Sequence, residues 1–329
     1  MNSLRSILLR REAGIFVMIA LVCLAVGAAK PQFLTLNSLR IILLLVPLIM
    51  IGAMGQMLVI VARHVDLSIG SILGLTAMAS GMMFRFHPEI WWQLGFVLSI
   101  GIGAILGIFN GLLVTFFRLP AIIVTLGTLN LYRGVTYIMS DAKQIDRQYV
   151  PTALKEMSQS SPIFDIPWII FMSFAVAALT YWFAMYTRIG REVFALGSNP
   201  IAAPLRGINV SKVTLLVFTI SGALSGLAGI MYASRWGFVN PSNTGSGFEF
   251  QVIAAVVIGG VSINGGVGTV LGTILGVLLL GCVAAALPLL GIPGTTQSAI
   301  YGAVILIALL IDRLVHLQGQ KNNVVRATA

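Results

Sequence analysis

The sequence predicts an all-α, polytopic membrane protein with about ten transmembrane helices, folded as a single transmembrane domain over residues 1–329. Hydrophobic residues make up 58% of the chain and charged residues only 9%, whereas soluble domains carry about 25% charge. The surplus apolar side chains have to face lipid, and each crossing takes about 20 of them. With short connections, the chain therefore has room for about ten crossings.

Apolar runs give the expected spans in order. The first run follows basic residues and resembles a signal peptide, but it continues to Lys30-Pro31-Gln32 without a convincing cleavage site. It is therefore expected to remain as an uncleaved first span. The eighth run is short, so it is expected to be a broken or tilted helix that protein covers. The ten expected spans are 13–30, 40–62, 66–84, 91–117, 120–139, 165–186, 213–234, 248–262, 267–290 and 297–315.

Small residues recur inside these spans, and the chain contains 35 glycines. Lipid gives helices no hydrophobic reason to associate, so close approach through small residues has to hold them together. Tight crossings are therefore expected at three glycine sets. They are Gly101, Gly103, Gly107 and Gly111; Gly222 and Gly226; and Gly268, Gly272 and Gly276. Packing roles are expected for two further sets, Cys23 with Cys282, and Met57, Met78, Met82 and Met83.

The basic residues predict the orientation. A net charge of +10 would suggest nucleic acid in a soluble protein, but no basic stripe with interleaved aromatic residues is present, so no nucleic-acid partner is expected. Lys and Arg are instead weighted toward one side of the spans, which places both termini in the cytoplasm. The polar loop 140–164 then lies outside, and the basic loop 187–212 lies inside.

The acidic residues favour an energy source outside this chain. None is predicted in the middle of a span: Asp66 falls near the inner end of the third span and Glu249 near the outer end of the eighth. His64, His87 and His316 also fall at span edges. Ion-coupled carriers usually need acidic or histidine relays within the membrane. A self-contained secondary sugar carrier or channel is thus the alternative, and a scaffold without transport is a third possibility.

No enzyme chemistry is predicted. The sequence has neither a Gly-x-x-x-x-Gly-Lys-Ser/Thr phosphate loop nor a Gly-x-Ser-x-Gly nucleophile turn. The glycine-rich run 259–268 lacks the lysine of a phosphate loop and lies between two apolar runs, so it is interpreted as a tight inner turn. We therefore expect no catalytic residue, no cofactor and no metal site.

The basic loop 187–212 contains a short helix signal. Asn199 is a residue type that caps a helix, Pro200 suits the first helical position, and Gly207 suits the exit. A short cytoplasmic helix is expected, with Ala202, Ala203 and Leu205 available for docking. From the pattern alone, an ordinary interfacial helix and a partner-docking helix are equally supported.

Several ordered motifs carry a resemblance to a known family. They are Asp66-Leu67-Ser68-Ile69-Gly70-Ser71, Pro120-Ala121-Ile122-Ile123-Val124-Thr125-Leu126-Gly127-Thr128, Tyr132-Arg133-Gly134, Ala195-Leu196-Gly197-Ser198-Asn199, Gly207-Ile208-Asn209-Val210 and the stretch from Gly247-Phe248-Glu249-Phe250 to Gly265-Gly266. Over most of its length the chain resembles the permease subunits of ATP-binding-cassette (ABC) importers of the ribose, xylose, rhamnose and autoinducer-2 group. The approach Arg63-His64-Val65-Asp66 is closer to the autoinducer-2 branch, and rhamnose permeases are an equally good match.

The resemblance implies a bacterial inner-membrane permease with several partners: two cytoplasmic ATP-binding subunits, a second permease copy or a sister permease, and a periplasmic sugar-binding protein. It implies that the loop acts as a coupling helix seated on the ATPase, through Asn199, Pro200, Ala202, Ala203, Leu205, Arg206 and Gly207. The solute would be rhamnose, a ribose-like sugar or autoinducer-2.

Candidates for the translocation path come from polar residues in the spans, whose side chains can hydrogen-bond hydroxyl groups. They are Gln56, Asn110, Thr125, Thr128 and Asn130. For each one, hydrogen bonding between helices is at least as good an interpretation.

Overall fold

The computed structural model describes residues 11–159, 166–293, 296, 299–303, 306–307 and 310. In this part of the chain, eight helices are long and apolar enough to cross a membrane, and the extended structure is limited to isolated bridges such as that between Ile145 and Val239. The predicted all-α, polytopic fold is confirmed. The tenth expected span, 297–315, lies largely outside the described residues.

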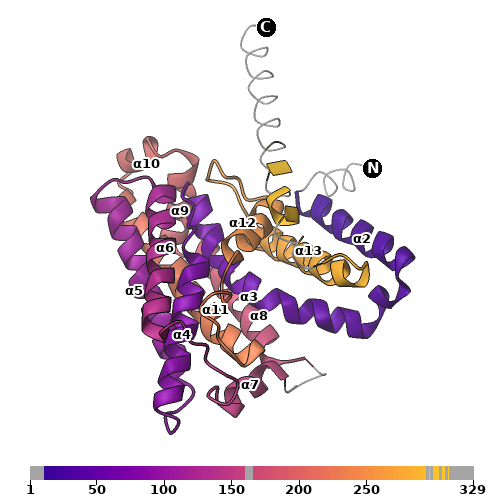
Figure 1. The fold of residues 1–329 in the computed structure, drawn as a ribbon. Helices are drawn as coiled ribbons and strands as arrows, with labels where there is room; N and C mark the ends of the chain where they lie inside the picture. The colour runs from indigo at the N-terminus through magenta and orange to yellow at the C-terminus, as the bar shows by residue number, and fades with distance from the viewer. Residues whose placement is uncertain are drawn as a thin grey trace.

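The helices follow the expected spans closely (Figure 1). Two helices that the sequence analysis did not predict, α7 and α9, lie in the two longer loops. The elements in order are α2 (Arg11–Ala29), η1 (Pro31–Leu34), α3 (Leu36–Val61), α4 (Ile69–Phe86), α5 (Leu94–Phe116), α6 (Ala121–Ser140), α7 (Thr152–Gln159), α8 (Trp168–Tyr186), α9 (Arg188–Ser198), α10 (Ala202–Leu205), α11 (Val210–Trp236), α12 (Phe248–Ile258) and α13 (Val270–Leu289).

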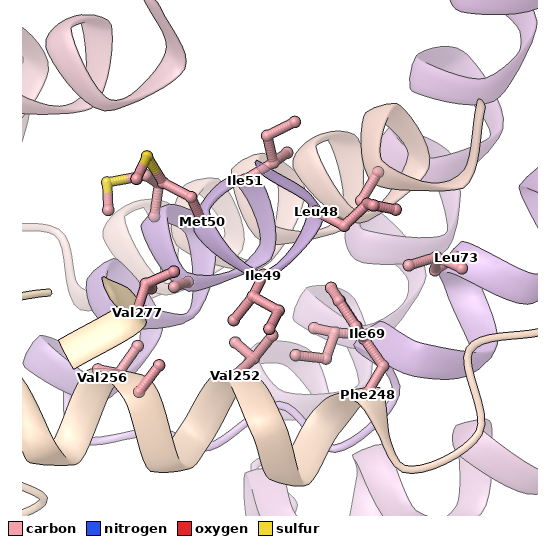
Figure 2. Packing of buried hydrophobic residues seen from close by; sticks show 14 of the residues in the cluster. Leu48, Ile49, Met50, Ile51, Ile69, Leu73, Phe248, Val252, Val256 and Val277 are labelled. Atoms are coloured by element: carbon pink, nitrogen blue, oxygen red, sulfur yellow. The ribbon is translucent and has the colours of Figure 1, made fainter. Parts of the chain in front are cut away.

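Helix α3 forms the centre of the bundle. Over an apolar stretch of 18 residues in α3, 89% of the residues are buried, against 17% in such a stretch of α2 and 28% in one of α6. Figure 2 shows Ile49 of α3 pointing toward Val252 of α12, with Phe248 beside Ile69 of α4. The outer helices leave large apolar side chains such as Phe16, Ile123 and Leu179 exposed. Such surfaces suit lipid, so the burial pattern agrees with a membrane bundle.

Glycines bring α5 and α11 into backbone contact. A Cβ atom on Gly107 would lie 3.0 Å from the carbonyl carbon of Phe218 and 3.1 Å from the Cα of Gly222. Gly103 meets Gly222 and Gly226 in the same way, whereas Gly101 has no neighbour within 4 Å. The glycine pattern therefore predicted the crossing correctly, and the structure shows that Gly101 takes no part in it.

Helix α12 is a half-helix, as its short apolar run predicted. Its 11 residues span about 16 Å, roughly half of the hydrocarbon core. The preceding segment, 237–247, runs from the end of α11 to a point within the bundle, where Gly245 touches Gly70 at the start of α4. Val239, Pro241, Thr244 and Gly245 of this segment are buried, and burial in protein is the condition for irregular structure at membrane depth.

A second irregular segment, 62–68, connects α3 to α4. Arg63 adopts a left-handed conformation with φ 67°, and the chain then turns back along α3. With its amide oriented to suit its neighbours, Gln56 donates to the Asp66 carbonyl at 3.3 Å and accepts from the Asp66 N–H at 3.2 Å. The side chain thus satisfies backbone groups that would otherwise be unpaired, and α4 begins inside the bundle.

Candidate coupling segment and buried polar network

The segment α9–α10 connects α8 to α11 and is built from capped turns. Thr187 caps α9, accepting from the Gly190 N–H at 3.0 Å. Asn199 then accepts from the N–H groups of Ile201 at 3.1 Å and Ala202 at 2.9 Å, as a helix cap does. Gly207, with φ 80°, ends the turn. The short helix, its Asn199 cap and its glycine exit were all predicted correctly.

The exposed face of this segment differs in part from the expected one. Leu205 is 85% exposed, and so is Ile201 at 82%, which the sequence analysis did not select. Pro200, Arg206 and Gly207 are also exposed, whereas Ala202 is half-buried. Ala203 is only 3% exposed, so the expectation that it is available for docking is wrong. Ala203 faces the helix bundle because a single helical turn is held in place only when one of its sides is buried.

Arg63 fixes the segment to the bundle. Its Nε donates to the Gly197 carbonyl at 2.6 Å and its Nη2 to the Ser198 carbonyl at 3.4 Å, at the end of α9. A cation is favourable there because the last carbonyls of a helix are unpaired and carry partial negative charge. Nothing in the sequence links Arg63 to a residue 134 positions away, so the analysis of motifs did not find this contact.

The glycine-rich turn 259–268 completes the attachment. Gly266 donates its N–H to the Val61 carbonyl at the end of α3 at 2.9 Å, and a Cβ atom on Gly197 would lie 3.0 Å from the Gly266 Cα. The interpretation of this run as a tight turn is confirmed. A displacement of α9 would thus act directly on α3 and on the turn between α12 and α13.

A fully buried carboxylate, Asp66, lies at the centre of a polar network. Its Oδ1 accepts from the Ser68 N–H at 2.9 Å and the Ser68 hydroxyl at 2.6 Å, and its Oδ2 accepts from Ser221 of α11 at 3.3 Å. Asn110 of α5 donates to the Ser68 hydroxyl at 2.8 Å and accepts from the Tyr132 hydroxyl of α6 at 3.0 Å. The network therefore ties segment 62–68 to three helices.

Four of the five path candidates gather at this network. Gln56, Asn110 and Thr125 are fully buried and Thr128 nearly so, and Thr125 donates to the Val65 carbonyl at 3.3 Å. The hydrogen bonds of Gln56, Asn110 and Thr125 join elements of one bundle, and Thr128 donates to Thr125 within α6 at 3.4 Å, which favours the packing interpretation. Asn130 differs: it lies exposed on α6 and donates only within its own helix, to Leu126 at 3.0 Å.

A second buried acid, Glu249, lies in the first turn of α12. It is 7% exposed, and its Oε2 has no hydrogen-bond partner in the described part of the chain. Arg133 reaches the same region from α6, donating to the Thr244 carbonyl at 2.7 Å. Asp66 and Glu249 do lie at helix ends, but these helices begin within the bundle. The absence of buried acids was therefore a wrong inference, and it no longer argues against an ion-coupled carrier.

Comparison with known proteins decides the family. The family model described as "Branched-chain amino acid transport system / permease component" matches residues 38–309, which run from the first turn of α3 past the end of α13. The chain belongs to this permease family. The resemblance to importer permeases is thereby confirmed, and the chain is a multi-pass membrane transport component.

Curated relatives of this family match nearly the whole chain. The autoinducer 2 import system permease protein LsrC of Salmonella typhimurium is 36% identical over 315 residues, which are 95% of this chain and 88% of that protein. The LsrC protein of Klebsiella pneumoniae is 37% identical over 311 residues, 94% of this chain and 88% of its own. That of Photorhabdus laumondii is 35% identical over 321 residues, 96% and 93%. No solved structure matches the chain.

Proposed function

We propose that this permease is the membrane subunit of an ATP-driven importer and that it moves a monosaccharide-type solute. Relatives named as autoinducer 2 import permeases, aligned over 95% of the chain, support autoinducer-2 as one such solute; rhamnose and ribose-like sugars share its hydroxyl-rich chemistry. The single observation that carries the importer assignment is the exposed segment Ile201–Gly207, held rigidly to the bundle by Arg63.

The proposed mechanism takes its energy from a separate subunit. Two cytoplasmic ATP-binding subunits would press on the exposed apolar side chains Ile201 and Leu205, which suit a protein cleft better than water. Movement would pass through Arg63 to α3 and through Gly266 to the turn before α13. A periplasmic binding protein would deliver the solute at the other end of the bundle.

The translocation path is proposed to run along the exposed face of α6. Asn130 lies on this face in the middle of an apolar helix, and Gly127 and Gly134 beside it have no neighbour within 4 Å. An amide exposed to lipid in mid-span is unfavourable. A second permease, either another copy or a sister chain, would face this side and enclose a hydrated path with Asn130 in its wall.

The test measures coupling in vesicles that contain the permease, its ATPase and its binding protein. Arg206→Glu, on the exposed face, should lower solute uptake per ATP at least about fivefold, a coupling loss near 1 kcal/mol. Arg63→Ala should lower it about threefold, because the contact that it removes is partly exposed to water. The control is Arg118→Ala, an exposed arginine with a similar left-handed backbone (φ 53°) between α5 and α6.

Unchanged coupling in both Arg206→Glu and Arg63→Ala, with normal membrane insertion, would reject the coupling assignment. Uptake by the permease alone under a proton gradient would instead support the secondary-carrier alternative, for which the buried Asp66 is the favouring observation.

A further inference from the structure

A cavity of about 790 Å³ lies where α3 begins and where α11 and α13 end. This end of the bundle is opposite to α10, since α11 runs from the α10 side to the cavity. Its volume falls within the range of small-molecule sites, roughly 300–1,000 Å³. The floor is apolar and includes Leu48, Leu73 and Phe248.

The cavity wall carries carboxamide groups from separate elements. Gln32 comes from η1, Asn37 from α3, Asn243 from segment 237–247 and Gln251 from α12. Each carboxamide offers both a donor and an acceptor. Four carboxamide residues around one largely apolar cavity are the composition expected of a binding site for a polar molecule.

Arg235 supplies a positive charge to the same wall. Its Nε has no hydrogen-bond partner in the described residues, and the ion pairs found in the described segments do not include it. Its guanidinium lies 5.5 Å from the ring centroid of Trp236, which is 43% exposed and also lines the cavity. Among the described residues the charge therefore has no acidic partner. Because Nε is buried, the two terminal nitrogens of the guanidinium are the groups that would meet the oxygen atoms of a ligand.

We propose that this cavity is a holding site for a hydroxyl-rich small solute of the monosaccharide class. Arg235 would donate to its oxygens, the carboxamides would both donate to and accept from its hydroxyls, and the Trp236 ring would cover a C–H face. A lipid phosphodiester offers only acceptors and would leave the carboxamide oxygens unused, and free phosphate, which carries few hydroxyl donors at neutral pH, would use fewer of them than a sugar does. This inference rests on the proposed import of such a solute and adds a holding site separate from the path along α6, since no residue of α6 lines the cavity.

The test follows solute binding directly, in the purified permease without ATPase or binding protein. Ser246→Cys places a near-isosteric thiol at the cavity wall, in a background with Cys23→Ser and Cys282→Ala, and the protein is held in phosphatidylcholine nanodiscs. L-rhamnose, D-ribose, autoinducer 2 and inorganic phosphate are each offered before a maleimide. At least one of the three sugar-type solutes should slow labelling about threefold or more, and Ala284→Cys, which lines the same cavity without belonging to the proposed binding groups, should repeat the effect as a second reporter.

Arg235→Gln should abolish this protection while Arg85→Gln preserves it. Arg85 is a suitable control because it is half-buried at the same end and lies over an aromatic ring, Tyr149, at 5.2 Å, outside the cavity. Protection by phosphate alone, or by none of the four compounds, would overturn the proposal, as would equal protection in the Arg235→Gln variant.

The outcomes separate this inference from the importer assignment. If uptake in the full complex still requires the ATPase but no solute protects the thiol, the cavity assignment alone fails. If a solute protects the thiol but uptake proceeds without the ATPase, the importer mechanism fails and the binding site stands.

Discussion

Asn110 and Asn130 are the same residue type on neighbouring membrane helices, yet the structure gives them different surroundings. Asn110 is fully buried, and its amide links Ser68 to Tyr132 through bonds of 2.8 and 3.0 Å. Asn130 lies exposed on α6 and bonds only to its own helix. One amide therefore serves the fold, whereas the other is free to serve transport.

Substitution by leucine should separate these two roles. Asn110→Leu removes the buried hydrogen bonds to Ser68 and Tyr132, whose hydroxyls keep Asp66 and Leu106 as partners, and each lost bond destabilises by about 0.5–1.5 kcal/mol. We expect a clear fall in the melting temperature of the purified protein. Asn130→Leu should change the free energy of unfolding by less than about 0.5 kcal/mol but lower solute uptake. Equal stability of the two variants would contradict the network assignment.

The sequence identified the polar candidates but not their roles. Gln56, Asn110 and Thr125 were selected by residue type, and the structure places them around segment 62–68. That segment was not separated from the helix because Val65, Leu67 and Ile69 continue the apolar run of α4. Hydropathy measures side-chain chemistry and does not report whether the backbone is helical. The burial of Asp66 therefore became known only from the structure.

At the scale of elements, the contact between α5 and α11 depends on the absence of side chains. Gly107→Ala would place a methyl group 3.0 Å from the Phe218 carbonyl carbon and 3.1 Å from the Gly222 Cα. Both neighbours are backbone atoms and cannot rotate away, so the helices have to separate. Overpacking of this kind destabilises by about 1–3 kcal/mol.

Gly101→Ala is the matched control because no atom lies within 4 Å of the added methyl group. Alanine also has the higher helix propensity, so this variant should be as stable as the parent or slightly more so. Thermal unfolding of the two variants in the same detergent measures the difference. If Gly107→Ala had the same melting temperature as Gly101→Ala, the assignment of a close crossing between α5 and α11 would be wrong.

Element boundaries show what local pattern can predict. The half-helix α12 was expected because the length of an apolar run can be read from the sequence, and this run was too short to cross the bilayer. Helix α9 was not expected because its outer face carries Arg188, Arg191 and Glu192, so its composition resembles a loop. The contact between Arg63 and Gly197 holds α9 in place. These residues are far apart in the sequence, so no local sequence pattern predicts the contact.

The whole molecule has two chemically different ends. At one end, the turn 259–268 lies near the start of α2, since Thr269 donates to the Glu12 carboxylate at 3.1 Å, and the same turn contacts α9, which leads into α10. Arg11 at the start of α2 and the basic residues of the segment Arg188–Lys212 therefore belong to one side. At the other end lie α7 and the loop after α6, where Lys143 pairs with Asp141 at 2.7 Å. Figure 1 shows α10 and α7 at opposite ends of the bundle.

This separation predicts a definite labelling pattern across the membrane. Positive charge near short connections is retained in the cytoplasm, so the end with α10 should face inward. In a background with Cys23→Ser and Cys282→Ala, a membrane-impermeant maleimide should label Lys143→Cys in right-side-out vesicles and leave Leu205→Cys unmodified. Inverted vesicles should give the opposite result, because Leu205 is 85% exposed at the α10 end. Labelling of Leu205→Cys from the outside would reverse the orientation and place the coupling segment out of reach of any cytoplasmic ATPase.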